Sequence, residues 1–262
     1  MTQEKLLVIS PTQIHQTEII FNPEQLHYLR RVLRLQPGDS FIAMNGEGNQ
    51  WLATLTVESG EITATLQTEI RHQTELPVDV ILMAALPKGN GFDEVVRQVT
   101  ELGVTEIRPI LSERTLLKPS DNRVKRWRRI ATEAAEQSER QRVPAIFEPI
   151  SLTQGWCQVI TALGEIKPVT YICVARGEFP HLLNCLGEGR QQWIANGKPA
   201  KPRLLIAVGP EGGWTSGEVE GAIGCGFQPV SLGARILRAV TVPGVILSWV
   251  MGVWEQSSLQ KL

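Results

Sequence analysis

Continuous apolar runs constrain the fold of this chain more than any other feature of its sequence. The runs VDVILMAA at 78–85 and LLIAV at 204–208 contain one charged residue between them, and a glycine-containing bend follows each. Strands buried on both faces of a parallel sheet have this composition, whereas half-exposed strands alternate apolar and polar residues. We therefore predict an α/β domain with a mainly parallel sheet over residues 78–262.

The rest of that region alternates between strand-like and helix-like patterns, as such a domain requires. Further strands are predicted at 105–111, 169–175 and 228–232. Helices are predicted at 93–102, 124–141 and 242–254, where apolar residues recur every three or four positions. The segment 187–201 is interpreted as a polar excursion and is assigned no function.

Residues 1–73 follow a different pattern and form a predicted domain of their own, with a linker near 73–77. Threonine and β-branched residues occupy alternate positions in short segments between glycine-rich turns, which predicts a small antiparallel sheet or barrel. The strand segments are KLLVIS, DSFIAMN, QWLATLTVE and EITATLQTEI.

A single helix is predicted within this domain, over residues 22–35. Asn22 and Gln25 have the spacing of a capping box, and leucines recur on one helix face. The opposite face carries His27, Arg30, Arg31 and Arg34. Because three arginines without a nearby acid repel one another, we interpret this face as a contact for RNA phosphates. A solvated charged face is the alternative.

Composition limits the class of protein. A chain of 262 residues with 42% hydrophobic and 20% charged residues suits a globular fold, and no apolar run approaches the length of a membrane helix. The N-terminus lacks the pattern of a signal peptide, so we expect a cytoplasmic protein. Neither the cysteines nor the histidines have metal-ligand spacing, so we expect buried thiols and no metal. The cysteines are Cys157, Cys173, Cys185 and Cys225.

Two glycine-containing bends follow strands that end at the same edge of the predicted sheet. GPEGG at 209–213 follows the apolar run 204–208, and Thr215 with Glu218 then forms a capping box for a helix. SLGARILR at 231–238 follows the last strand. Such bends can grip a flat heterocycle and a ribose through backbone groups, although a purely structural turn remains the alternative. The first bend matches neither a P-loop nor G-x-G-x-x-G.

The motifs resemble those of a known family. ALPKGNGFDEVVRQVTELGV, RWRRIATEAAEQSERQRVP and VGPEGGWTSGEVEGAIGCGFQPVSLGARILR resemble, in this order, the RsmE family of 16S ribosomal RNA uracil-N3 methyltransferases, within the SPOUT superfamily. LRRVLRLQPGDSF is similar to that family's PUA-like RNA-binding domain. The resemblance spans most of residues 78–250. It implies a PUA-like β-barrel followed by a SPOUT domain with a C-terminal trefoil knot.

The same resemblance implies a function. The protein would bind S-adenosyl-L-methionine, form a homodimer and methylate N3 of a uridine in the 16S ribosomal RNA of the small subunit. One wall of the cofactor pocket would be Gly209, Pro210, Glu211, Gly212 and Gly213. The other wall would be Leu232, Gly233, Ile236 and Leu237.

Catalysis requires that uracil N3 lose its proton, so a group is needed that stabilises the resulting anion. Arg238 is our candidate, because a guanidinium offers several fixed donors. The alternative is a structural ion pair between Arg238 and a carboxylate such as Glu211. No histidine stands in these motifs, so an imidazole base is not expected.

Further RNA contacts are expected from the helix 124–141 and from the loop that follows the strand 78–85. Arg128 and Arg129 would contact phosphates, and Lys88, Gln137 and Arg140 would approach the RNA or the partner subunit. A solvated helix face is the alternative. The apolar stripe of the helix 242–254 fits either core packing or a subunit interface.

Two departures from the family pattern leave the activity open. Ala239-Val240 stands where the family has Thr-Glu, and Asn90-Gly91 stands where an acid and a basic or polar residue are common. Three rival functions therefore remain: an RNA-binding assembly factor without catalysis, a methyltransferase for another RNA base, and a nucleotide-phosphate binder.

Overall fold

The computed structural model describes residues 5–58, 60–71, 73–115, 119–152, 156–161, 168–198 and 200–255. The chain forms two compact units. The first unit comprises Met1–Glu75 and Ala135–Val143, and the second comprises Leu76–Ala134 and Pro144–Leu262. The segment 135–143 thus belongs to the first unit, although the sequence pattern groups it with the α/β region.

The first unit contains a six-stranded sheet in the order β1-β4-β5-β6-β3-β2. Its strands are β1 (Leu6–Val8), β2 (Ile14–His15), β3 (Glu18–Ile20), β4 (Ser40–Met44), β5 (Gln50–Glu58) and β6 (Glu61–Glu69). The pairing is antiparallel except between β1 and β4, which are parallel. The four predicted strands are present, whereas β2 and β3 are too short to show an alternating pattern.

The predicted helix of this unit begins as expected but ends early. Gln25 N donates to Asn22 Oδ1 (2.8 Å) and Asn22 N donates to Gln25 Oε1 (3.0 Å), which completes the capping box. The α-helix α1 covers only Pro23–His27, and a π-helical turn follows at Tyr28–Val32. Arg34 has φ of +53°, so it lies beyond the helix rather than on its face.

The segment 135–143 is held within the first unit by a buried ion pair. Arg140 Nη2 lies 2.5 Å from Glu75 Oε2, and the two side chains are 4% and 11% exposed. Val8 N donates to Glu136 Oε1 (2.8 Å). The expectation of a helix reaching residue 141 is wrong, because α3 (Asp121–Gln137) ends before Glu139, which has φ of +56°.

The second unit contains a sheet in the order β10-β8-β7-β12-β11-β13, with β9 beside β8, and every pair is parallel. The predicted parallel sheet is therefore confirmed. Its strands are β7 (Asp79–Ala85), β8 (Glu106–Leu111), β9 (Ala145–Ile146), β10 (Ile150–Ser151), β11 (Val169–Cys173), β12 (Arg203–Val208) and β13 (Gln228–Val230).

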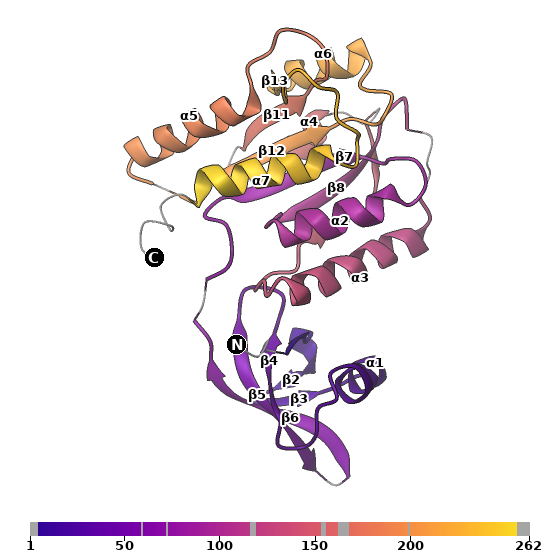
Figure 1. Ribbon diagram of the computed structural model, residues 1–262, viewed down its shortest axis with the longest axis vertical. Coiled ribbons are helices and arrows are strands. Elements are labelled where there is room, and N and C mark those ends of the chain that lie inside the picture. The colour runs from indigo at the N-terminus through magenta and orange to yellow at the C-terminus, as the bar shows by residue number, and fades with distance from the viewer. Residues whose placement is uncertain are drawn as a thin grey trace. The chain divides into compact units, whose positions relative to one another are not determined.

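Helices complete this unit, and α7 packs against both α2 and α5 (Figure 1). Besides α3, they are α2 (Gly91–Glu101), α4 (Trp156–Thr161), α5 (Leu182–Ala195), α6 (Ser216–Gly224) and α7 (Val242–Trp254). The interpretation of 187–201 as a polar excursion is wrong, because most of α5 lies there. The apolar residues that anchor α5, Leu182 and Leu186, precede the polar stretch.

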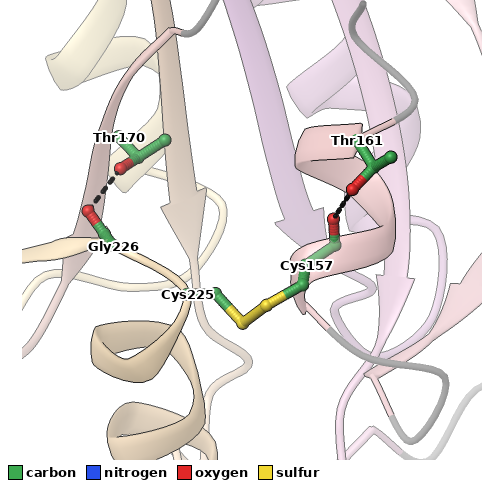
Figure 2. The surroundings of a disulfide bond; sticks show 5 residues. All are labelled: Cys157, Thr161, Thr170, Cys225 and Gly226. Atoms are coloured by element: carbon green, nitrogen blue, oxygen red, sulfur yellow. Dashed lines mark hydrogen bonds between the residues drawn. A yellow bond between two sulfur atoms is a disulfide. The ribbon is translucent and has the colours of Figure 1, made fainter.

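Two of the four cysteines form a disulfide, which corrects the expectation of free thiols. Cys157 in α4 is bonded to Cys225, the residue after α6, and 68 positions separate them in sequence (Figure 2). Cys173 and Cys185 are free and buried, and burial raises the pKa of the Cys173 thiol to about 12. Within the described ranges no helix is long and apolar enough to cross a membrane, and no cluster of His, Cys, Asp and Glu could hold a metal ion.

Candidate active site

The carboxyl ends of the central strands bring both glycine bends to one edge of the sheet. Val208 of β12 pairs with Ala84 of β7, and Cys173 of β11 pairs with Val230 of β13. Because β11 lies between β12 and β13, the bends leave the sheet two strand spacings apart, or about 10 Å.

The bend at 209–213 is a tight turn that Trp214 folds over. Gly213 has φ of +69°, and its N–H donates to Pro210 O (2.9 Å). A Cβ at Gly209 would lie 3.0 Å from Trp214 Cε2, so the indole requires glycine there. Trp214 Nε1 donates to Cys173 O (3.0 Å), which ties the bend to β11.

The capping box predicted after this bend is also present. Thr215 N donates to Glu218 Oε2 (2.8 Å), and Glu218 N donates to Thr215 Oγ1 (3.3 Å). Glu218 is only 6% exposed. The bend therefore runs directly into a firmly capped helix α6.

The bend at 231–238 is anchored at its first residue. Ser231 N donates to Pro180 O (2.9 Å), and Leu182 N donates to Ser231 O (2.9 Å). Gly233 has φ of +106°, and its N–H donates to Ser231 Oγ (3.1 Å). Further along, Ile236 is 66% exposed. The start of this bend is thus fixed, while an apolar side chain projects from it.

Glu211 joins the first bend to the loop after β7. Its Oε1 accepts a hydrogen bond from Lys88 N (3.0 Å). Among the described residues Arg238 forms no ion pair with Glu211. Arg238 is exposed, and its carbonyl oxygen accepts from Thr241 N (2.8 Å) and Val242 N (3.1 Å) at the start of α7.

These residues fit a nucleoside-type cofactor. A Cβ at Gly213 would meet open space, so this side of the first bend is accessible to a ligand. Ile236 of the second bend offers an exposed apolar surface that an adenine ring would cover. Leu232 and Leu237 of the same bend are half-buried.

The RNA-binding candidates differ in whether their charged groups are already bonded within the protein. Arg128 donates to Ile146 O (2.9 Å) and to Glu148 Oε1 (2.9 Å), so its guanidinium is engaged within the protein. Arg140 is buried against Glu75. Arg128 and Arg140 are therefore no longer candidates for RNA binding. Arg129 is 70% exposed and has only a long contact of 3.5 Å with Glu133, which leaves its charge available.

In the first unit, two of the predicted arginines line a surface depression. The depression has a volume of about 320 Å³ and is formed by Pro23, Leu26, His27, Arg30 and Arg31. Arg34 is exposed outside it. Among the described residues no carboxylate lies within 4 Å of these three guanidinium groups, so they keep their charge for a polyanion.

The two departures from the family pattern meet in space. A Cβ at Gly91 would lie 2.8 Å from Val240 Cγ1 and 3.3 Å from Pro87 Cγ. Val240 therefore fills the volume that a side chain at position 91 would occupy. A close contact at the start of α2 thus couples Gly91 to Val240.

Sequence reasoning missed two residues at this edge. His181 Nδ1 accepts from Leu183 N (3.2 Å), and its Nε2 would lie 3.7 Å from a Cβ at Gly233, so an imidazole does stand beside the second bend. Arg114 donates to Gly212 O (2.6 Å) of the first bend. Both lie far from the glycine motifs in sequence, and only the sheet topology brings them there.

Comparison with known proteins agrees with this architecture. A family model described as an RNA methyltransferase domain matches residues 74–251, and one described as an RNA methyltransferase PUA domain matches 21–69. The Ribosomal RNA small subunit methyltransferase E of Synechocystis sp. is 47% identical over 249 residues, covering 95% of this chain and 78% of that protein. The protein of the same name from Bacillus subtilis is 32% identical over 231 residues, 86% of each chain.

A solved structure is similar over nearly the full length. The crystal structure of a Ribosomal RNA small subunit methyltransferase E from Neisseria gonorrhoeae, bound to S-adenosyl methionine, has a TM-score of 0.73 and 27% sequence identity. The match covers 96% of this chain and 97% of that one. The fold is thus that of an RNA methyltransferase, with a PUA domain and a parallel-sheet methyltransferase domain. The chain belongs to the ribosomal RNA small subunit methyltransferase E family, which confirms the resemblance seen in its motifs.

Replacing Gly91 by alanine is expected to lower the free energy of unfolding by about 1 to 2 kcal/mol, because the new Cβ overlaps Val240 and Pro87. The double variant G91A/V240A should recover most of this loss, and denaturant unfolding of the single and double variants measures the coupling. The control is G217A, whose Cβ meets open space. An equal loss in the single variant G91A and the double variant would contradict the proposed contact.

Proposed function

We propose that the protein transfers a methyl group from S-adenosylmethionine to N3 of a uridine in the 16S ribosomal RNA of the small subunit, in the cytoplasm. The observation that carries this is the pairing of two glycine bends at one edge of a parallel sheet, one with an open face at Gly213 and the other with an exposed Ile236. Membership of the ribosomal RNA small subunit methyltransferase E family supports the same substrate class.

The residues of this edge have distinct roles in the proposed reaction. When bound, S-adenosylmethionine supplies the electrophilic methyl group. Gly209–Gly213 and the wall of Leu232, Gly233, Ile236 and Leu237 hold the cofactor and exclude water from it. Arg238 stabilises the negative charge that develops on the uracil ring as N3 loses its proton. N3 is engaged in pairing within duplex RNA, so the target uridine must be unpaired or flipped out.

RNA binding is assigned to cationic groups that the protein leaves available. In the PUA domain these are Arg30, Arg31 and Arg34, and in the methyltransferase domain Lys88 and Arg129. Gln137 is exposed at the end of α3 and remains a candidate for a neutral contact. Positive side chains without internal partners gain most from counterion release on the RNA backbone.

We extend the proposal to the topology. The PUA sheet closes into a barrel, and the segment after β13 threads the loop 174–181 to form a trefoil knot. Hydrogen bonds hold the start of this segment beside the loop, because Val174 N donates to Val230 O (2.9 Å), Ser231 N donates to Pro180 O (2.9 Å) and Leu182 N donates to Ser231 O (2.9 Å). An experimental chain trace in which residues 231–255 bypass that loop would contradict it.

Loss of this protein is expected to remove one N3-methyluridine from small-subunit ribosomal RNA, as mass-spectrometric mapping of RNA from a deletion strain would measure. Wild-type protein should restore the modification. R238A should restore it at a rate reduced about a hundredfold or more, the cost of removing one anion-stabilising donor. The control is R235A, an exposed arginine of the same bend. An unchanged modification map would exclude this activity and favour an RNA-binding assembly role.

Replacing the two arginines of the depression, in R30S/R31S, is expected to weaken RNA binding and to flatten its dependence on salt. The slope of log K against log salt should fall by about 1.4, or roughly 0.7 for each lost phosphate contact to single-stranded RNA. Cofactor affinity should stay unchanged. The variant R97S, altered on the exposed side of α2, should keep the full slope. A wild-type slope in R30S/R31S would contradict the phosphate role.

We also propose a homodimer that uses α7. Val245, Trp249 and Val253 are only half-buried, whereas Val242, Ile246 and Val250 of the same helix are buried. Equilibrium sedimentation at micromolar concentration should give twice the mass of one chain, and V253E should shift the protein towards the monomer because a charge would be buried at the interface. A wild-type protein that sediments only as a monomer would contradict the dimer.

A further inference from the structure

We propose that Arg114 is the positioning residue that holds the bend 209–215 in its ligand-binding shape. The inference rests on the proposed function, since it assumes that this bend binds the cofactor. Arg114 lies just after β8, on the carboxyl edge of the sheet and 98 positions before Gly212 in sequence.

The guanidinium bonds directly to the backbone of the bend. Arg114 Nη1 donates to Gly212 O (2.6 Å) and, less closely, to Trp214 O (3.4 Å). Among the described residues no carboxylate lies within 4 Å of this guanidinium, so the carbonyl groups receive charge-assisted hydrogen bonds. A single side chain thereby contacts the carbonyl groups of the residues on either side of Gly213.

The aliphatic part of Arg114 explains why position 212 is glycine. A Cβ there would lie 3.2 Å from Arg114 Cδ and 3.5 Å from Arg114 Cβ. The arginine stem thus packs against bare backbone on one side of the bend. At the neighbouring Gly213 a Cβ would meet open space, so that position is not covered by Arg114.

Arg114 is itself held in place by its neighbours. Glu113 N donates to the buried Glu218 Oε1 (2.9 Å), so the backbone beside Arg114 is bonded to helix α6. Thr115 N donates to Ser112 O (3.0 Å), and Ser112 N donates to Thr115 Oγ1 (3.0 Å). The arginine therefore projects from a closed turn, which reduces the entropy lost when it binds the bend.

The contact of Arg114 with the bend restricts a backbone that would otherwise be flexible. Two adjacent glycines have more backbone freedom than any other pair, and a bend that explores many conformations binds a ligand weakly. Restricting it before the ligand arrives removes that cost from the binding step. Arg114 thus acts through the backbone of the bend and is not itself a catalytic residue.

The test compares R114A and R114K with R97A, an exposed arginine on α2 that has no contact with the bend. In the ligand-free protein, amide hydrogen exchange across 209–215 should be at least about tenfold faster in R114A, the effect of losing one charge-assisted hydrogen bond. R114K should be intermediate, because lysine keeps the positive charge but lacks the planar, pre-organised guanidinium whose Nη1 donates to both carbonyl groups. R97A should match the wild type.

Binding measurements complete the test. Calorimetric titration with S-adenosylmethionine should show an affinity about tenfold weaker in R114A, and millimolar guanidinium ion should restore part of it. RNA affinity should not change. Wild-type exchange rates and cofactor affinity in R114A would overturn the proposal. If the wild-type protein fails to bind S-adenosylmethionine, the proposed function fails instead, and the exchange data still decide whether Arg114 holds the bend.

Discussion

Parallel pairing of β12 with both β7 and β11 determines where the functional segments of the second unit can lie. The shared direction of these strands places the segments after residues 85, 111, 173, 208 and 230 at one edge. Antiparallel pairing would divide the same segments between two edges. Because the pairing is continuous from Arg203 to Val208, the position of the first glycine bend is fixed by backbone hydrogen bonds rather than by the bend itself.

Close contacts between glycines and larger side chains then shape this edge. Trp214 covers Gly209, the stem of Arg114 covers Gly212, and Val240 covers Gly91. In each case the missing Cβ leaves room for a side chain from elsewhere in the chain. These glycines are therefore needed for close packing as well as for backbone conformation.

Local sequence signals predicted much of the fold. The apolar runs 78–85 and 204–208 indicated the parallel sheet, and both capping boxes occur where the spacing of their residues placed them. These signals succeed because they depend on interactions within a few residues or on a strand buried on both faces. The two bends were predicted to share an edge for the same reason.

Features that depend on distant partners were not predictable in this way. Arg140 has the sequence context of a helix, yet Glu75 binds it in another part of the chain. In the sequence Arg128 looks like a free surface cation, because its hydrogen-bond acceptor, Ile146 O, lies 18 positions away. Helix α5 was missed because its buried residues precede a polar stretch that dominates its composition.

The bond between Cys157 and Cys225 makes the stability of the second unit depend on the redox state of two thiols. It encloses β11, α5, β12 and the first glycine bend in one covalent loop. By chain entropy, a cross-link of this span adds about 4 kcal/mol to the free energy of unfolding, close to the whole stability margin of many domains. Reduction of this bond opens the loop and removes that contribution. The oxidised and the reduced protein are therefore expected to differ in their resistance to heat and proteases.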